Sequence, residues 1–248
     1  MKFRCKNLLV TGGAGFIGSN YIDYLFQNYL DLNVYNIDKL TYAGKISNTE
    51  KFKSNSRYKL IIGDITDSNL LNTVFKKYNI DGVINFAAET HVDNSISDPE
   101  VFIKTNVNGV FNLLNTCYKF WMIKPNKPKL RFRHARFHQI STDEIYGSID
   151  KGSFTEESNY SPNSPYSASK SSADMLVRSY NKTFGLETTT SVSSNNFGPN
   201  QDLEKFIPKI IFNGINNLKI PVYGNGLNIR NWIFVSEHCK AIDLIFNK

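Results

Sequence analysis

Short apolar segments alternate with longer segments of helical periodicity along most of this chain. Six runs rich in apolar and β-branched residues are expected to form strands, at 7–13, 33–38, 58–65, 82–89, 137–142 and 188–194. Helical patterns begin between them, near Phe16, Asp67, Pro99 and Tyr166. Strands that alternate with helices are typical of βαβ units. The sequence therefore predicts an α/β fold: a Rossmann-like, doubly wound parallel sheet with helices on both faces.

The alternation weakens after Gly198. A helix is expected over 204–216, a short strand over 220–224 and a last helix from Ser236. We therefore predict a large domain at 1–195 and a smaller C-terminal lobe at 196–248. The last residues still follow a helical pattern, so we expect this lobe to be incomplete.

Composition restricts the class of protein. The chain has 248 residues, of which 41% are hydrophobic, enough for a substantial core. Its three cysteines, Cys5, Cys117 and Cys239, show no CxxC spacing, which argues against a metal site or a disulfide framework. Unpaired cysteines favour a reducing compartment, and we expect a cytoplasmic protein. No apolar run approaches the ~18 residues of a membrane helix, so no membrane association is expected.

The formal charge of +7 suits an anionic ligand, but it also suits a generally basic surface. The densest basic cluster lies at 124–136, where Pro125 and Pro128 predict a loop. It is either a nucleic-acid patch or a solvated connection. No aromatic stacking platform accompanies the charge, so we expect no nucleic acid.

A glycine-rich turn follows the first predicted strand. In VTGGAGFIGSN, Gly12, Gly15 and Gly18 have GxxGxxG spacing and precede a helix, an arrangement that lets a pyrophosphate approach the helix N-terminus. An ordinary tight turn is the alternative. However, Asp38 ends the second predicted strand ~20 residues later, where a carboxylate binds the adenosine ribose. Asp64 and Ile65 end the third, beside the expected adenine. The pattern predicts NAD rather than NADP, since Asp38 would repel a 2′-phosphate.

The segment YSASK places Tyr166 and Lys170 four residues apart on one helix face. A phenol has a pKa of about 10, too high for a base near neutrality. A lysine one turn away, together with an oxidised nicotinamide, is expected to favour the phenolate. Tyr166 then removes a proton from a sugar hydroxyl, and Lys170 also holds the nicotinamide ribose. A surface pair is the alternative.

Two adjacent carboxylates, Asp143 and Glu144, follow the predicted strand at 137–142. The carboxyl ends of parallel strands border the ligand crevice, so we expect both to face the same cleft as Tyr166. A solvated acid pair at the start of a loop is the alternative.

These stretches together resemble the extended short-chain dehydrogenases and, among them, the dTDP-glucose 4,6-dehydratase family. Epimerases of the superfamily share the glycine turn and YxxxK, whereas the Thr-Asp-Glu triplet is the dehydratase mark. The resemblance extends over 6–238 through segments that include VTGGAGFIGSN, FAAETHVDNSI, FHQISTDEIYG, SPYSASKSSADMLVRSY and IRNWIFVSEH.

The resemblance implies a lyase that oxidises C4 of dTDP-glucose, removes water across C5 and C6 and returns the hydride to C6. Tyr166 acts as base at the C4 hydroxyl, and Thr142 contacts the C4 oxygen. Glu144 acts as base at C5, and Asp143 protonates the departing C6 hydroxyl. Lys170 completes the implied catalytic set.

The resemblance also implies the binding residues and assigns 1–195 to NAD and 196–248 to the sugar nucleotide. The cofactor set is Gly12, Gly15, Phe16, Ile17, Gly18, Asp38, Lys39, Thr41, Asp64, Ile65, Ala87, Ala88, Thr105, Tyr166, Lys170 and Asn196. The substrate set is Thr90, Thr142, Asn195, Glu204, Lys205, Ile220, Pro221, Val222 and Arg230. The four histidines, His91, His134, His138 and His238, are expected to be structural or surface residues. Helices over 99–120 and 166–184 are expected to pair in a homodimer.

Asn94 replaces the arginine that is usual in the family, and Phe197 replaces a tyrosine. Two other functions stay open: an epimerase or dehydratase for UDP- or GDP-sugars, and an NAD-binding protein without activity.

Overall fold

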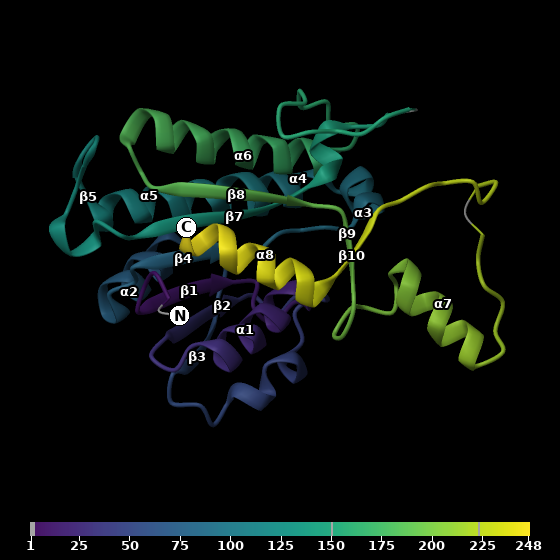
Figure 1. Ribbon diagram of the computed structural model, residues 1–248, viewed down its shortest axis with the longest axis horizontal. Coiled ribbons are helices and arrows are strands. Elements are labelled where there is room, and N and C mark those ends of the chain that lie inside the picture. The colour runs from purple at the N-terminus through teal and green to yellow at the C-terminus, as the bar shows by residue number, and fades with distance from the viewer. Residues whose placement is uncertain (1–2, 150, 223) are drawn as a thin grey trace.

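The computed structural model describes residues 3–149, 151–222 and 224–248. Its central sheet has six parallel strands in the order β3-β2-β1-β4-β7-β8 (Figure 1). They are β1 (Asn7–Thr11), β2 (Asn33–Asp38), β3 (Tyr58–Ile62), β4 (Gly82–Asn85), β7 (Arg136–Thr142) and β8 (Thr188–Ser193). The strand order reverses between β1 and β4, as in a doubly wound fold. The predicted fold class is confirmed.

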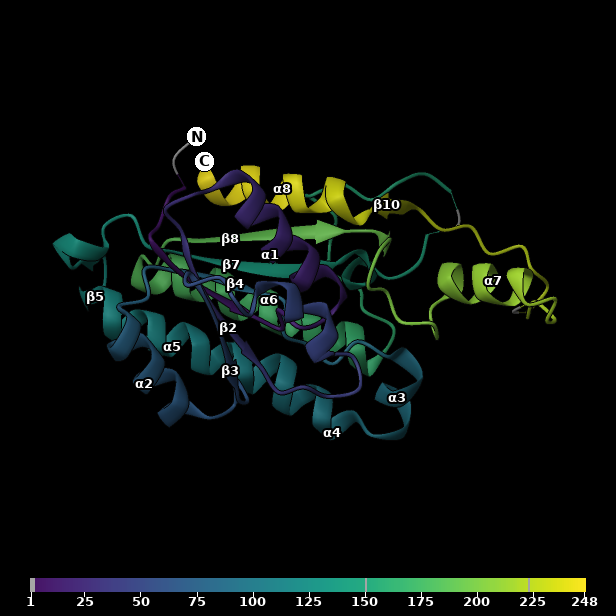
Figure 2. The same cartoon turned by 90° about the horizontal axis from the view of Figure 1, so that it is seen from below.

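Helices cover both faces of the sheet (Figure 2). On one face, α1 (Phe16–Asn28) and α8 (Val235–Asn247) pack over Leu8, Val10 and Ile84. On the other, α2 (Ser68–Tyr78), α5 (Val110–Trp121) and α6 (Pro165–Phe184) pack over Leu9 and Val83. Successive strand residues therefore enter opposite cores, as the two-residue period of a strand requires.

The helix predicted from Pro99 has a composite form. After the short α3 (Val92–Ser97), α4 (Pro99–Phe102) continues into a π-helical segment, η3 (Ile103–Gly109), and then into α5. The described 3₁₀ turns are η1 (Ile46–Asn48), η2 (Glu50–Phe52), η4 (Leu130–Phe132) and η5 (Asp143–Tyr146).

The predicted basic loop is partly a hairpin. Strands β5 (Met122–Lys124) and β6 (Lys127–Pro128) pair antiparallel around Pro125 and Asn126, the latter with φ +59°. The expectation of a plain loop was therefore wrong here, because asparagine tolerates the left-handed conformation of a tight turn.

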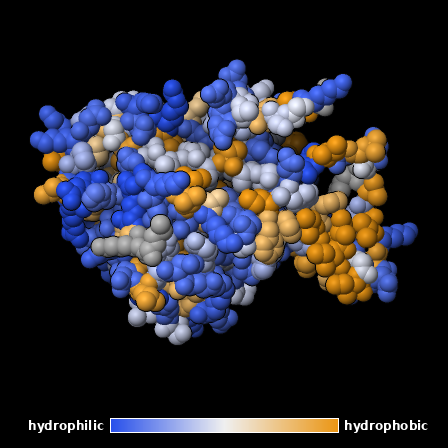
Figure 3. All heavy atoms as spheres, in the orientation of Figure 1, coloured by the Kyte–Doolittle hydropathy of each residue, from blue (hydrophilic) through white to orange (hydrophobic). Residues whose placement is uncertain are grey.

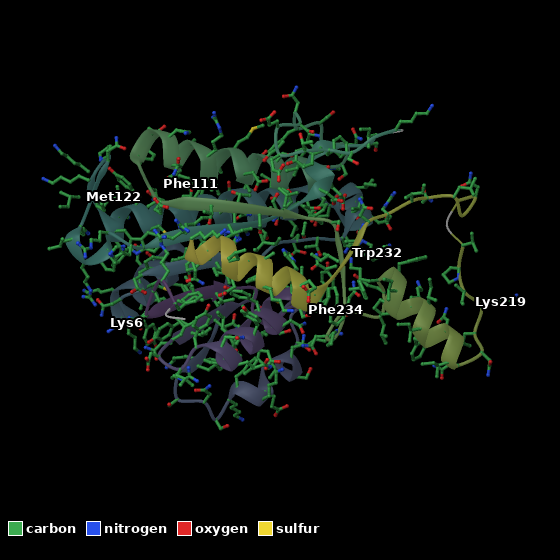
Figure 4. The ribbon with its side chains drawn as sticks, viewed as in Figure 1. Lys6, Phe111, Met122, Lys219, Trp232 and Phe234 are labelled. Carbon is green, nitrogen blue, oxygen red and sulfur yellow. The ribbon has the colours of Figure 1, made fainter. Side chains whose placement is uncertain are left out.

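The C-terminal part separates into two regions. Strands β9 (Asn195–Phe197) and β10 (Trp232–Phe234) pair in parallel, and Figure 4 labels Trp232 and Phe234 there. Between them, α7 (Phe206–Ile215) stands away from the sheet, whereas α8 lies against α1 (Figure 1). The boundary at residue 195 stays a prediction, and α8 packs with the first part of the chain.

The strand predicted over 220–224 does not form at Ile220–Val222, which have no regular structure; Tyr223 lies outside the described residues. A strand needs a neighbour for its hydrogen bonds. The structure instead pairs β10, which the sequence did not indicate, with β9.

Apolar side chains gather on the surface of α7 and of the segment after it (Figure 3). The exposed ones are Phe206, Ile211, Phe212, Ile215, Leu218, Ile220, Val222, Leu227 and Ile229. In 3–149, 151–222 and 224–248, no helix is both long and apolar enough to cross a membrane. The same residues contain no cluster of three His, Cys, Asp or Glu side chains suited to a metal ion.

Candidate active site

A cleft of about 530 Å³ lies along the carboxyl ends of the strands. Its walls are the loops after β1, β2, β3 and β4, the end of β7, the start of α6 and the segment 193–205. This is the position where open α/β sheets bind their ligands. The volume is typical of a site for a small molecule.

The glycine turn forms one wall. Gly12 has φ +71°, and a Cβ atom there would lie 2.6 Å from the backbone nitrogen of Ala87. A Cβ atom on Gly18 would collide with the carbonyl oxygen of Gly12. Only glycine therefore lets β1, β4 and α1 approach so closely. Gly15 caps α1 without a side-chain hydrogen bond, which leaves the first N–H groups of the helix available to an anion.

Asp38 joins two loops of the cleft. It accepts hydrogen bonds from the Ala14 N–H at 2.8 Å and from the Leu40 N–H at 2.8 Å. Burial raises the pKa of Asp38, and these two hydrogen bonds oppose the rise. The carboxylate thus fixes the glycine turn while it borders the cleft.

Lys39 is paired with Asp64 across the next loop, with 2.9 Å between Nζ and Oδ2. Burial opposes the ionisation of Asp64, but hydrogen bonds from Lys39 and Thr66 outweigh it and lower the pKa of Asp64. The ion pair partly neutralises the charge of Lys39, so this side chain offers less positive charge to a cofactor.

A buried polar chain lies beneath the cleft. The Thr11 hydroxyl donates to Asn85 Oδ1, and Asn85 Nδ2 donates to Gln139 Oε1 at 2.9 Å. The chain links the carboxyl ends of β1 and β4 to the middle of β7. Sequence reasoning missed it because the three residues are far apart along the chain.

The two acids begin the turn after β7. Thr142 caps this turn by accepting the Glu144 N–H at 3.3 Å. Burial raises the pKa of both Asp143 and Glu144, and the Asp143 charge raises the pKa of Glu144 further. The charges of Arg230 and Lys205 act in the opposite sense on Glu144. The pair is thus arranged so that one acid can keep its proton.

Tyr166 and Lys170 project from the first turns of α6. The helix begins with a capping box between Ser164 and Ser167 and has Pro165 at its start, which fixes the direction of its first turn. Lys170 Nζ donates to the Ile140 carbonyl at 2.6 Å.

The expectation that Lys170, together with an oxidised nicotinamide, favours the Tyr166 phenolate stays a prediction. Burial raises the pKa of Tyr166, the charges of Glu144 and Asp143 raise it further, and the Thr142 hydroxyl opposes them. The Lys170 ammonium bonds to the backbone of β7 instead of the phenol. A cation that enters the cleft beside Tyr166 would reverse this balance.

The lining of the cleft also includes Thr90, Thr105 and the Asn195–Asn196 segment. Thr105 lies in the π-helical segment, a form that is frequent at functional sites. Asn196 Nδ2 donates to Ser193 and Ser194, and its Oδ1 accepts from His238 Nδ1 at 2.8 Å. His238 therefore orients a residue of the cleft.

Two contacts hold the segment before α7 against the cleft. Lys45 Nζ lies 2.7 Å from Asp202 Oδ2, and His91 Nε2 lies 3.8 Å from Glu204 Oε2. Glu204 and Lys205 therefore border the cleft as expected.

The structure brings every predicted cofactor residue and the acid triplet to this one cleft. Of the predicted substrate residues, Ile220, Pro221, Val222 and Arg230 do not line it, and their contacts with substrate stay a prediction. The lining residues that the sequence did not indicate include Tyr42, Lys45, Glu89, His91, Asp93, Asn200, Gln201 and Asp202. Apart from Asp93, which lies in α3, their position in loops after strand ends was the available signal.

Three comparisons relate this arrangement to known proteins. The family model described as GDP-mannose 4,6 dehydratase matches residues 9–248. The dTDP-glucose 4,6-dehydratase of Neisseria gonorrhoeae is 46% identical over 239 residues, which cover 96% of this chain and 68% of that protein. The Escherichia coli enzyme of the same name is 45% identical, over 97% of this chain and 68% of its own length.

Solved structures of a dehydratase and of an epimerase are similar to this chain. The Bacillus anthracis dTDP-glucose 4,6-dehydratase in complex with NAD has 42% identity and a TM-score of 0.87, and the match covers 98% of this chain and 72% of that one. The Thermus thermophilus UDP-glucose 4-epimerase in complex with NAD has 26% identity and a TM-score of 0.82, over 98% of this chain and 75% of that one.

Proposed function

This chain belongs to the GDP-mannose 4,6-dehydratase family, and from that premise we propose that it catalyses the NAD-dependent dehydration of dTDP-glucose to dTDP-4-keto-6-deoxyglucose. The observation that carries the proposal is the Thr142-Asp143-Glu144 triplet, which borders one cleft together with Tyr166 and Lys170. The relatives of 45–46% identity support dTDP-glucose as substrate. The epimerase alternative has weaker support, since the Thermus thermophilus epimerase shares 26% identity.

The cleft residues fit NAD. The close approach that Gly12 and Gly18 permit, and the uncapped start of α1, suit a pyrophosphate. Asp38 is anchored by two backbone N–H groups, and a carboxylate there disfavours a 2′-phosphate. When bound, NAD would supply the hydride acceptor at C4 and the hydride donor at C6.

Tyr166, Thr142 and Lys170 act at C4 in this proposal. Tyr166 takes the proton of the C4 hydroxyl, with the Thr142 hydroxyl oriented toward the same oxygen. Lys170, buried and bonded to β7, provides a fixed positive charge one helical turn from Tyr166. The resulting ketone acidifies the C5 hydrogen, which prepares the elimination.

Glu144 and Asp143 act at C5 and C6. Glu144 takes the C5 proton, and Asp143 gives a proton to the C6 hydroxyl, which leaves as water. Glu144 then returns its proton to C5. Each turnover leaves Tyr166 protonated and Asp143 ionised, so one proton must return to Asp143 before the next cycle. The raised pKa of Asp143 favours that return.

Mass spectrometry tests the activity. The purified chain is incubated with NAD and dTDP-glucose, beside a variant that carries both Asp143→Asn and Glu144→Gln. We expect the loss of one water from the sugar nucleotide with the native chain alone. Unchanged dTDP-glucose in the presence of bound NAD would overturn the proposal, and conversion of a UDP- or GDP-sugar instead would support the runner-up.

We also propose a cytoplasmic homodimer that pairs the α4–α5 segment and α6 with a second copy. Exposed apolar side chains on these helices, Ile103, Phe111 and Met175, support this surface (Figure 4 labels Phe111). Sedimentation of the chain and of Phe111→Glu tests it, with dimer expected for the native chain and monomer for the variant.

A further inference from the structure

A buried carboxylate, Asp174, lies one turn beyond Lys170 on α6. Tyr166, Lys170 and Asp174 follow each other at four-residue spacing, so they share one face of the helix. All three are buried, with exposed fractions of 7%, 5% and 5%. The proposed reaction assigns roles to the first two and none to Asp174.

Asp174 and Lys170 hold neighbouring residues of β7. The Ser141 hydroxyl donates to Asp174 Oδ2, and Lys170 Nζ donates to the carbonyl of Ile140. The acid triplet begins at Thr142, directly after Ser141. The two side chains of α6 therefore fix the strand end from which the proposed catalytic acids project.

The second carboxylate oxygen of Asp174 indicates that this residue acts through its negative charge. Oδ1 is buried and has no hydrogen-bond partner among the described residues. An unpaired buried charge is costly, and so is a buried ammonium such as Lys170. Each charge lowers the cost of the other across one helical turn. Burial lowers the pKa of Lys170, and Asp174 is the charged group that opposes this effect.

The groups described near Asp174 do not supply Lys170 with the same buried negative charge. Tyr146 on η5 and Tyr160 in the following loop lie near it. Burial raises the pKa of both phenols; the Asp174 charge comes next for Tyr160, and the charges of Glu156 and then Asp174 for Tyr146. Arg178 and Asp174 both line a cavity beside β8, but Arg178 is exposed. From β8, Thr188 and Thr190 add hydroxyls without charge.

We propose that Asp174 is a positioning residue that keeps Lys170 positively charged and, through Ser141, fixes the end of β7 that carries the catalytic acids. The proposal rests on the dehydratase function for the role of Lys170. It implies that the cleft loses its fixed cation at a lower pH when Asp174 is neutral.

The test is Asp174→Asn, which keeps the shape and an acceptor for Ser141 but removes the charge. NAD affinity is measured by calorimetry, and dTDP-glucose turnover by mass spectrometry, from acidic to alkaline pH. In the variant, the alkaline loss of both is expected about one pH unit lower, with turnover along that limb reduced by up to roughly tenfold. Asp174→Ser removes the charge without adding bulk and carries the same expectation.

Asp243→Asn is the matched control. Asp243 is a similarly buried helical carboxylate on α8, where it accepts from Tyr29 at 2.8 Å, away from the cleft. Its replacement should leave both pH profiles unchanged. An alkaline limb of wild-type position in Asp174→Asn and Asp174→Ser, or an equal shift in Asp243→Asn, would overturn the proposal. If the native chain binds NAD but does not convert dTDP-glucose, the proposed function is wrong. The pH dependence of NAD affinity would still test the role of Asp174.

Discussion

Asp143 and Glu144 are neighbours in sequence, yet their surroundings divide the proposed work between them. Burial raises the pKa of both, and the charge of Asp143 raises the pKa of Glu144 further, so ionisation of one acid favours the protonated form of the other. Two acids of unequal environment are what a reaction with one base and one acid requires.

Single substitutions should separate the two roles. Glu144→Gln removes the base at C5, so solvent deuterium should no longer enter C5. Asp143→Asn removes the acid at C6 but leaves that exchange in place. In both variants we expect C4 oxidation to continue and product formation to fall at least 100-fold, the usual contribution of a general acid or base.

Mass spectrometry of the sugar after incubation in deuterated water measures the exchange. Equal loss of exchange in the two variants would show that the acids act as one unit, against the assignment of separate roles.

At the scale of the element, the start of α6 is the part of the helix that orients Tyr166. The Ser164 side chain accepts the Ser167 N–H at 3.1 Å, and Ser167 bonds back to the Ser164 N–H at 3.0 Å. The two residues of this capping box lie on either side of Tyr166, so the cap sets the direction of the proposed base.

Ser164→Ala should therefore reduce both stability and turnover. Loss of a cap costs about 1 kcal/mol. Asp67→Ala is the matched control, because Asp67 caps α2 by accepting from Asn69 and Leu70, and α2 carries no proposed catalytic residue. Thermal unfolding should show similar losses in both variants, with a clear fall in turnover for Ser164→Ala alone. Equal turnover in both would mean that the cap does not orient Tyr166.

The elements of the sheet could be predicted because their signals are local. Apolar β-branched runs gave the six strands, and Asp67 marked the start of α2. The glycine turn and YxxxK were also readable, since each is a spacing within one turn or helix.

Contacts through space could not be predicted. The β9–β10 pair joins two three-residue strands more than 30 residues apart, which leave no periodic signal. The Asp174–Ser141 and His238–Asn196 contacts likewise depend on the packing of α6 and α8. The position of Ile220–Val222 outside the cleft had no local signal either.

Across the whole molecule, α7 and α8 differ sharply although both follow residue 195. No residue of α7 is buried, whereas α8 buries Val235, Cys239, Ile242 and Phe246 against the sheet. Local opening costs little where few apolar contacts are lost. We expect amide hydrogens of α7 to exchange much faster than those of α8, which should exchange near the global rate. Hydrogen exchange with mass spectrometry measures this, and equal protection would show that α7 is covered in solution.

Two buried histidines should make the fold sensitive to acid. Burial lowers the pKa of His138 to about 3 and of His238 to about 4, so both stay neutral in the fold. In the unfolded chain each takes a proton near pH 6.5. Their stabilising effect is therefore complete above pH 6.5 and is lost as the pH falls toward 4 and 3, by up to about 1.4 kcal/mol per unit and residue. Burial raises the pKa of Asp174 to about 6, so its effect on the fold is opposite. Its contribution to stability is complete below pH ~4 and is lost as the pH rises through 6.

His138→Asn should flatten the fall in stability between pH 6.5 and 4, because asparagine does not titrate. His138 lies on β7, bonded to Thr189 and Ser191, so the variant leaves the proposed catalytic groups in place. The exposed His134→Asn is the control and should keep the native slope. Denaturant unfolding across this range measures the slopes. If the free energy of unfolding of His138→Asn falls with pH as steeply as in the native chain, the acid sensitivity comes from other groups. Burial of neutral His138 would then not be the cause of the lost stability at low pH.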